Sequence, residues 1–481
     1  MKKLVQRLIS NVQSLPNART FGLWTLGIGL LTLVGCAVGP DYKRPPINAP
    51  EAFRGEIEVS TNSFADLPWW QVFHDDNLQN LIRIALTNNY DLRIAVTRVE
   101  QARAVAAEAR AGFFPQLDYA AIAGSGRNVA DNMPSPSGTG GTVFAADANA
   151  SWEIDLWGQI RRLNESARAQ YLATEEGRHG VRLSLLSDVA SDYFRLLELD
   201  EELEIARRTT NSFGESLKIF TQRAEGGTAS DLESSRAEAA LADAMAAIPS
   251  LQDQVSSTEN EICLLLGRNP GPISRISPAI VALPPEVPAG LPSALLERRP
   301  DVREAEQLLR SANAQIGESE AEFFPQIGLT AFLGKVSPQL SAFTLGGANA
   351  WGVAATATGP LFEGGRLVGQ YHQAKAARDE ARLRFEQTAL AALGDVSDAL
   401  VLRERLGEIR EQQAREVTAL TRAVKVSTER YIAGKASYYE VLEAQQQLFP
   451  AQLNLSGTQR DQQLVVVDLY KALGGGWKDG Q

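Results

Sequence analysis

The sequence predicts an α+β membrane protein with an internal two-fold repeat. Each chain is expected to give four β-strands to a trimeric twelve-stranded β-barrel, which a long α-helical coiled-coil barrel continues. Three observations predict this fold: motifs that return in the same order, paired segments of alternating polarity, and two long runs without proline. With 481 residues, of which 44% are hydrophobic, the chain is long enough to bury a substantial core.

The repeat is visible in three short motifs. Residues 91–95 return as 301–305, residues 113–116 (Phe-Phe-Pro-Gln) return as 323–326, and residues 227–233 resemble 434–440. The first two motifs return after 210 residues and the third after 207, so the second copy is 210 − 207 = 3 residues shorter between them. We therefore divide the chain after residue 35 into an N-terminal segment (36–90), repeat 1 (91–268), a proline-rich linker (269–300), repeat 2 (301–473) and a C-terminal tail (474–481).

Each repeat contains a predicted β-hairpin, at 117–157 in the first copy and at 327–362 in the second. Apolar and polar side chains alternate almost strictly in residues 144–155, and this period of two is typical of a strand. Residues 117–124 supply the partner strand, and the second copy repeats the pattern at 327–333 and 351–357 with a loop near Pro338. Trp152 and Trp351 lie near strand ends, where aromatic residues favour a membrane–water interface. The alternative interpretation is half of a soluble β-sandwich.

Long helices follow the hairpins. The proline-free runs 158–226 and 361–433 could each form a helix of roughly 100 Å, at 1.5 Å per residue. The first run carries a coiled-coil seam at alternating spacings of three and four, namely Leu196, Leu199, Leu203, Ala206, Thr210, Phe213, Leu217 and Phe220. Helices predicted at 91–112 and 230–266 would span roughly 33 and 55 Å, so that together they nearly match the long helix. Each copy is therefore expected to place one long helix beside one composite helix.

The strand count predicts association between chains. Four strands cannot close a barrel, and an open edge in lipid would leave backbone groups unpaired. Two chains would give eight strands, whose interior side chains fill the barrel, whereas three chains would give twelve strands and an open lumen. A conducting structure therefore favours the trimer.

The turns at the far ends of the long helices have two kinds of sequence signal. Glycines predicted to cap the helix C-termini are Gly226 and Gly227 in the first turn and Gly434 in the second. Predicted capping boxes that open the next helices are Ser230 with Glu233 and Ser437 with Glu440. Glu443 lies one helical turn beyond Glu440, so a trimer would place six carboxylates at one constriction and favour cations there. The alternative is that Glu233 and Glu440 only cap and Glu443 is solvated.

The N-terminus has the features of a lipoprotein signal peptide (residues 1–35). Lys2, Lys3 and Arg7 precede an apolar run at 21–34, which ends in the lipobox Leu-Val-Gly before Cys36. We expect a covalent diacylglycerol and an N-acyl lipid on Cys36, with no other cofactor. Ala37 in place of aspartate resembles the outer-membrane sorting pattern of bacterial lipoproteins. An N-terminal anchor helix that ends in a cysteine is the alternative.

The composition argues against two other classes of function. A net charge of −11 disfavours binding to nucleic acid. His74, His179 and His372 are scattered, and neither a Ser/His/Asp arrangement nor metal-ligand spacing accompanies them, so no catalytic residue and no metal site is predicted and the chain is not expected to be an enzyme.

The assembled motifs resemble the TolC-like outer-membrane efflux proteins, specifically the NodT-type lipoprotein branch. They cover nearly the whole chain after residue 35: residues 36–42, Arg44-Pro45, Trp69-Trp70, the two Phe-Phe-Pro-Gln motifs, 290–301 and 473–477. The resemblance implies a homotrimer in outer-membrane lipid with a helical tunnel in the periplasm. It also implies a periplasmic adaptor (a membrane fusion protein) and an inner-membrane resistance-nodulation-division pump as partners, together with the export of small molecules.

The same resemblance implies a gate at the helical tips. Tyr431, Glu233, Glu440 and Glu443 fall on the positions where such proteins hold the closed entrance through tyrosine–acid contacts and acidic rings. Ala436 and Gln446 stand where some relatives have an arginine. Two alternative functions stay open at this stage, namely a tunnel for polypeptide secretion and a lipid-anchored coiled-coil scaffold without a pore.

Overall fold

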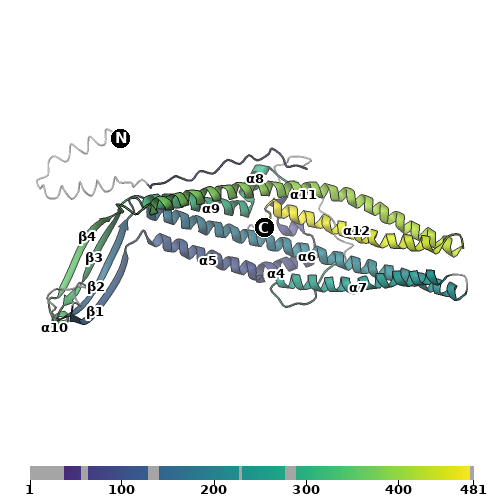
Figure 1. Cartoon of the computed structure of the whole chain (residues 1–481), viewed down its shortest axis with the longest axis horizontal. Helices are drawn as coiled ribbons and strands as arrows, with labels where there is room; N and C mark the ends of the chain where they lie inside the picture. The colour runs from purple at the N-terminus through teal and green to yellow at the C-terminus, as the bar shows by residue number, and fades with distance from the viewer. Residues whose placement is uncertain (1–36, 56–62, 128–139, 227–229, 277–288, 477–481) are drawn as a thin grey trace. The chain divides into compact units, whose positions relative to one another are not determined.

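A computed structural model describes residues 37–55, 63–127, 140–226, 230–276 and 289–476. The predictions for Cys36 and Gly227 lie outside the described residues. The elements run in the order η1 (Phe64–Asp66), α3 (Trp69–Val72), α4 (Asp76–Asn88), α5 (Tyr90–Ala111), β1 (Gln116–Arg127), β2 (Gly140–Ile154), α6 (Gln159–Glu225), α7 (Asp231–Leu265), α8 (Pro292–Arg298), α9 (Pro300–Ala321), β3 (Gln326–Ser337), α10 (Leu340–Leu345), β4 (Asn349–Thr358), α11 (Arg366–Ile432) and α12 (Tyr438–Ala472) (Figure 1).

The internal repeat is confirmed element by element. Helices α5 and α9 both have 22 residues, α6 and α11 both have 67, and α7 and α12 both have 35. The first strands, β1 and β3, both have 12 residues. Start positions differ by 210 up to the first strand of each hairpin and by 207 from the long helix onward, so the three-residue difference lies within the hairpins.

One predicted boundary is wrong. The segment 269–300 was expected to be only a linker, but it contains α8 and the start of α9. The end of α8 at Arg298 lies 210 residues after the end of α4 at Asn88, so these two helices are themselves repeat counterparts. A proline at the first position of α8 is compatible with a helix start, because the missing N–H has no partner there in any helix.

The chain folds into two compact units that cut across the repeats. One unit contains Ala104–Ala169 and Arg310–Glu380 together with the segment before Arg44, and therefore holds the sheet. The other contains Arg44–Arg103, Gln170–Leu309 and the chain from Ala381 onward, and therefore holds the helical hairpins. Each unit thus draws matching parts from both copies.

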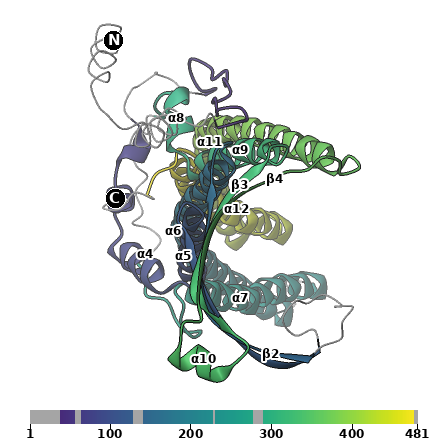
Figure 2. The same ribbon diagram turned by 90° about the vertical axis from the view of Figure 1, so that its left-hand side faces the viewer.

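The four predicted strands form one curved antiparallel sheet in the order β1-β2-β3-β4 (Figure 2). The register places whole rows of side chains on the same face, because directly opposed residues point the same way. Two rows on one face are Leu117, Ala150, Ala331 and Val353, and Tyr119, Ala148, Leu333 and Trp351. The row between them on the other face is Asp118, Asn149, Phe332 and Gly352. The sheet therefore has an apolar face and a more polar face, as the alternation predicted.

Aromatic residues hold particular positions on both faces of the sheet. Phe332 is an apolar residue on the polar face, and its ring occupies the space beside Gly352, where a Cβ would lie 2.6 Å from it. Trp152 lies near the helical end of β2, whereas Trp351 lies near the opposite end of the sheet at the start of β4. Aromatic residues therefore mark both ends of the apolar face, as expected for two membrane interfaces.

The N-terminal segment is fixed against the sheet unit by a buried arginine. Arg162 is only 5% exposed and donates from Nε to the Val38 carbonyl at 3.1 Å, and from Nη2 to the Gly39 carbonyl and Asp41, both at 3.1 Å. The backbone N–H of Val38 also donates to the Trp157 carbonyl at 2.9 Å. The first described residues therefore lie beside the end of β2 that leads into α6.

In the helical unit, α7 folds back along α6 and α12 folds back along α11 (Figure 1). The seam predicted on α6 is confirmed: Leu199 and Ala206 are buried in one cluster with Leu251 of α7, while Phe213 and Phe220 belong to a second cluster. Each such apolar side chain removed from water contributes roughly 1.5–3 kcal/mol. Within the described part of the chain, no helix is both long and apolar enough to cross a membrane.

The composite helices are also confirmed, through matching joints in the two copies. In the first, Gly267 follows the C-cap of α7 with a left-handed φ of +65°. The Asn89 side chain donates to the Leu265 carbonyl at 3.0 Å and accepts from the Leu92 N–H at the start of α5. In the second, Arg299 donates to the Ala472 carbonyl at 3.2 Å at the end of α12. Asn89 and Arg299 are 210 residues apart, so the same position joins both pairs of helices.

Gly267→Ala should lower the apparent melting temperature of the purified protein. The added Cβ would require a left-handed backbone and would lie 2.6 Å from the Asn88 carbonyl oxygen, which we expect to cost about 1–3 kcal/mol. Gly214→Ala in the interior of α6 is the matched control, since nothing lies within 4 Å of its Cβ position and alanine favours helix. Unfolding of both variants would be monitored by circular dichroism. Equal melting temperatures would refute this account of the joint.

Candidate functional site: the tips of the helical hairpins

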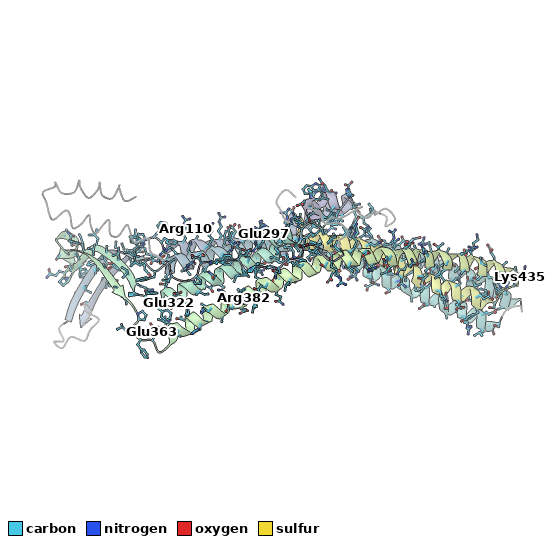
Figure 3. All side chains as sticks on the ribbon, turned by 90° about the horizontal axis from the view of Figure 1, so that it is seen from above. Arg110, Glu297, Glu322, Glu363, Arg382 and Lys435 are labelled. Atoms are coloured by element: carbon cyan, nitrogen blue, oxygen red, sulfur yellow. The ribbon has the colours of Figure 1, made fainter. Side chains whose placement is uncertain are left out.

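The turn between α11 and α12 is built as the sequence predicts. Gly434 has a φ of +71°, and its N–H donates to the Tyr431 carbonyl at 2.9 Å while the Lys435 N–H donates to the Arg430 carbonyl at 2.8 Å. This pair of bonds is a Schellman motif, which satisfies the last carbonyls of the long helix. Lys435 marks this tip in Figure 3. In the other hairpin the prediction for Gly226 is wrong, because its N–H continues the helical pattern to Gln222 and its φ is not positive.

The two predicted capping boxes have different outcomes. Ser437 is the N-cap of α12, and its backbone N–H donates to Glu440 Oε1 at 3.4 Å, as the capping box requires. Ser230 is likewise the N-cap of α7, but among the described residues its backbone N–H makes no hydrogen bond to Glu233. The capping box with Glu233 is therefore not formed, and the carboxylate of Glu233 is not committed to that role.

Tyr431 lies in an aromatic cluster rather than beside an acid of its own chain. Its side chain is 7% exposed, and its ring centroid lies 5.2 Å from that of Phe220 and 6.3 Å from that of Tyr438. Phe220 and Tyr438 are closer still, with centroids 3.8 Å apart. Phe220 comes from α6 and the two tyrosines from the other hairpin, so this cluster holds the two hairpins of one chain together.

Arg223 strengthens the same junction. Its guanidinium lies 4.4 Å from the centroid of the Tyr431 ring, and its Nη2 donates to the Ile432 carbonyl at 3.4 Å. A cation over an aromatic face contributes roughly 0.5–2 kcal/mol. Sequence reasoning missed Arg223, because nothing in its local pattern shows that it contacts a residue more than 200 positions away.

Two further tip residues were not predicted. Gln445 is 7% exposed, and its Nε2 donates to Ser212 Oγ at 3.0 Å and to Ser216 Oγ at 3.2 Å, which places a polar contact between α12 and α6. Tyr438 is 3% exposed, and its hydroxyl has no hydrogen-bond partner among the described residues. Burial, with smaller effects of Tyr431 and Glu233, raises the pKa of Tyr438 to about 12.

The predicted acidic residues are less enclosed. Glu440 and Glu443 are exposed, and Glu443 accepts from Gln447 Nε2 at 3.4 Å, while Glu233 is half-buried. Among the described residues no hydrogen bond joins the Tyr431 hydroxyl to any of them. Their role at an entrance therefore stays a prediction. The part of the chain that the structure describes also contains no cluster of three or more potential metal ligands.

These features define a class of protein: a sheet with an apolar face and, among the described residues, two unpaired edges, together with long helical hairpins that share an aromatic cluster near their tips. The chain belongs to the outer membrane efflux protein family, whose model matches residues 81–268 and 291–475. The two matches begin 210 residues apart, in agreement with the offset of the repeat.

Relatives with assigned roles match almost the entire chain. It is 35% identical over 459 residues to the solvent efflux pump outer membrane protein SrpC of Pseudomonas putida, covering 94% of this chain and 98% of SrpC. It is 32% identical to the cation efflux system protein CusC of Escherichia coli O6:H1, with 93% and 97% covered. The probable outer membrane lipoprotein SilC of Salmonella typhimurium is also 32% identical, with 93% and 97% covered. All three are named as outer-membrane, efflux or lipoprotein components and none as an enzyme.

Solved structures agree with this assignment. The outer-membrane channel OprN superimposes with a TM-score of 0.84 at 28% identity, covering 92% of this chain and 100% of OprN. The open state of the Neisseria gonorrhoeae MtrE outer membrane channel gives 0.82 at 30% identity, with 92% and 99% covered. The resemblance to TolC-like outer-membrane efflux proteins is therefore confirmed, and with it an outer-membrane efflux role.

Raising the pH from about 10 to 12 should weaken the tip through Tyr438. Its folded pKa is raised, so its stabilising contribution is complete below the unfolded value near 10 and is lost as the pH passes about 12, a total of roughly 3 kcal/mol or less. In Tyr438→Phe this part of the alkaline destabilisation should vanish, with little loss at pH 7 because the hydroxyl makes no hydrogen bond. In Tyr438→Phe, the tyrosinate absorbance measured near 295 nm should show one tyrosine fewer titrating close to pH 12 than in the parent protein. A variant that titrates like the parent would contradict this.

Proposed function

We propose that the protein is a passive trimeric conduit of a tripartite efflux system, which exports small molecules from the periplasm to the exterior. The observation that carries the proposal is the two-faced sheet with two open edges. Among the described residues, strands β1 and β4 are each paired on one side only. In lipid those edges require partners, and three copies would close twelve strands around a lumen lined by the polar face.

The repeat supports the same assembly through the helices. Within one chain, α6 packs on α9: Ser166 Oγ lies 2.9 Å from Ser311 Oγ, and Arg303 Nη2 lies 2.7 Å from Glu176 Oε1. The counterparts of these helices are α11 and α5, and among the described residues no hydrogen bond or ion pair joins these two helices. Helix α5 has Ala95 as its one buried residue, whereas many positions of α9 are buried.

The uncovered faces of α5 and α11 are apolar in part. Ile94 and Val105 of α5 are 47% and 52% exposed, and Leu383 and Leu390 of α11 are 56% and 63% exposed. A contact of α11 with α5 of the next copy would repeat the contact of α6 with α9. Because this contact joins two different surfaces, it generates a ring when the rotation closes.

The remaining parts of the proposal follow from the ends of the molecule. We propose that Cys36 carries the lipid anchor, since the following residues lie beside the strand end that leads into α6. We propose that the tips form the gated periplasmic entrance, with Glu440, Glu443, Glu233 and Tyr431 around it, and that a periplasmic adaptor and an inner-membrane resistance-nodulation-division pump dock there. The names of SrpC and CusC favour small cargo over polypeptides.

A pair of cysteines should cross-link the trimer at the predicted helix contact. The counterparts of Ser311 and Ser166 are Gln101 (311 − 210) and Gln373 (166 + 207), which should face each other between copies. In a Cys263→Ser background, Gln101→Cys with Gln373→Cys should give covalent dimers and trimers on mild oxidation, seen by denaturing gel electrophoresis. Each single variant is the control. Monomer alone from the double variant would contradict the proposed interface.

The acidic tip should make the pore prefer cations. In planar bilayers, Glu440→Gln combined with Glu443→Gln should lower the cation-to-anion permeability ratio, because a ring of carboxylates attracts cations. Glu416→Gln, which removes an exposed carboxylate of α11 more than four helical turns before the tip, is the matched control and should leave the ratio unchanged. Reversal potentials that do not differ between these variants would argue against acidic selectivity. Protein that never conducts, even with Tyr431→Phe, would argue against a conduit.

A further inference from the structure

An arginine of the N-terminal segment occupies one surface site of the second repeat, between α8, α9 and α11. Arg44 pairs through Nη1 with Glu297, which Figure 3 labels, and its Nε lies 3.3 Å from Glu306 Oε2. Its Nη2 donates to the Leu296 carbonyl at 3.4 Å, and its guanidinium lies 5.9 Å from the centroid of the Phe385 ring. We call this place the Arg44 site. It is acidic, and a cation on an extended segment fills it.

The first repeat has a pocket of about 360 Å³ between α4, α5 and α6, which we call the copy-1 pocket. Leu86, Leu92 and Val96 give it an apolar wall. Its remaining lining includes Arg93, Arg178, Arg182 and His179, and none of the described residues that line it is acidic. The pocket is therefore a basic cavity with apolar sides.

The copy-1 pocket is the repeat counterpart of the Arg44 site. Subtracting 210 from Leu296, Glu297 and Glu306 gives Leu86, Thr87 and Val96, and subtracting 207 from Phe385 gives Arg178. All four of these counterparts line the pocket. Both glutamates that bind Arg44 are thus replaced by uncharged residues, and the aromatic ring is replaced by a guanidinium. The site is retained while its charge is reversed.

Among the described residues, Arg178 makes no ion pair with an acid and reaches Glu176 only through His179. Arg178 Nη2 lies 2.9 Å from His179 Nε2, and His179 Nδ1 lies 3.2 Å from Glu176 Oε2, but Glu176 also binds Arg303 at 2.7 Å. The Nε of Arg178 is buried and has no hydrogen-bond partner among the described residues. A buried donor in this state is unfavourable, because it has lost its hydrogen bonds to water without gaining another acceptor.

We propose that the copy-1 pocket docks an acidic side chain, glutamate or aspartate, carried by an extended segment of a partner protein. Carboxylates match the planar fork of arginine, and the apolar wall suits the methylene groups that carry the carboxylate. The Arg44 site gives the mode of binding, since there a side chain enters from extended backbone.

A second copy of this chain does not supply the acid through the proposed trimer contact. Within the chain Arg303 meets Glu176, and the same arithmetic places Leu383 (176 + 207) of a neighbouring copy against Arg93 (303 − 210). Leucine cannot neutralise an arginine. At this position the neighbouring copy offers no carboxylate, and we assign the acid to a different protein.

A peptide designed from the Arg44 segment tests the docking site. The probe is a fluorescent peptide of residues 41–48 carrying Arg44→Glu, and the reference probe has the native sequence. The full-length protein should bind the Arg44→Glu peptide, measured by fluorescence anisotropy, and should bind the native peptide at least tenfold more weakly. Arg178→Gln should weaken binding of the Arg44→Glu peptide about tenfold or more, since charge-assisted hydrogen bonds contribute about 1.5–3 kcal/mol.

Two further variants separate docking from general electrostatics. Arg98→Gln removes an exposed arginine of α5 that does not line the pocket, and it should leave binding within twofold. Arg178→Glu should reverse the preference, so that the native peptide binds better. Should Arg178 variants fail to fold, Arg93→Gln at an exposed position should still weaken binding at least threefold. Equal binding of both peptides, or equal losses in Arg98→Gln and Arg178→Gln, would overturn the proposal.

Discussion

The rest of the structure depends on one constraint of length: a helix of 67 residues must be covered by two shorter helices placed end to end. Helices of 35 and 22 residues almost fill that length, and the joint between them supplies the remainder. At each joint a left-handed glycine ends one helix, and a side chain at the start of the next binds the freed carbonyl. Without these caps, carbonyl groups at the helix ends would lack hydrogen bonds in the middle of the surface that packs against the long helix.

The two copies meet this constraint with different chemistry. The first joint uses the neutral amide of Asn89, whereas the second uses Arg299, which also pairs with Asp301 at 2.7 Å and Asp395 at 2.8 Å. A similar divergence separates the Arg44 site from the copy-1 pocket, and the exposed α5 from the buried α9. The duplicated backbone has therefore kept its geometry while the two halves acquired different neighbours. Helix α9 of the second copy is largely buried within the chain, whereas its counterpart α5 has one buried residue.

The tips show how the two helical hairpins of one chain are held together. Phe220, Arg223, Tyr431 and Tyr438 connect the two hairpins through rings and one guanidinium, with the Gln445 contacts beside them. Any movement that separates the hairpins must first break this aromatic cluster. The exposed carboxylates of Glu440 and Glu443 lie outside it, so charge at the tip and cohesion of the tip are carried by different residues.

The sequence by itself determined the repeat, the strands with their two faces, the lengths of the helices and the glycine cap at residue 434. Each of these follows from local periodicity or from a local backbone requirement, which neighbouring residues are enough to reveal. Only the tertiary structure decided that α8 forms within an apparent linker and that no capping box forms between Ser230 and Glu233. It also decided that Tyr431 packs on Phe220 and Arg223. The tertiary structure alone also revealed the copy-1 pocket, because the walls of this pocket come from helices about 90 residues apart. Its role was inferred by comparison with the Arg44 site. Contacts between distant segments depend on packing, and no local pattern encodes which side chains will meet.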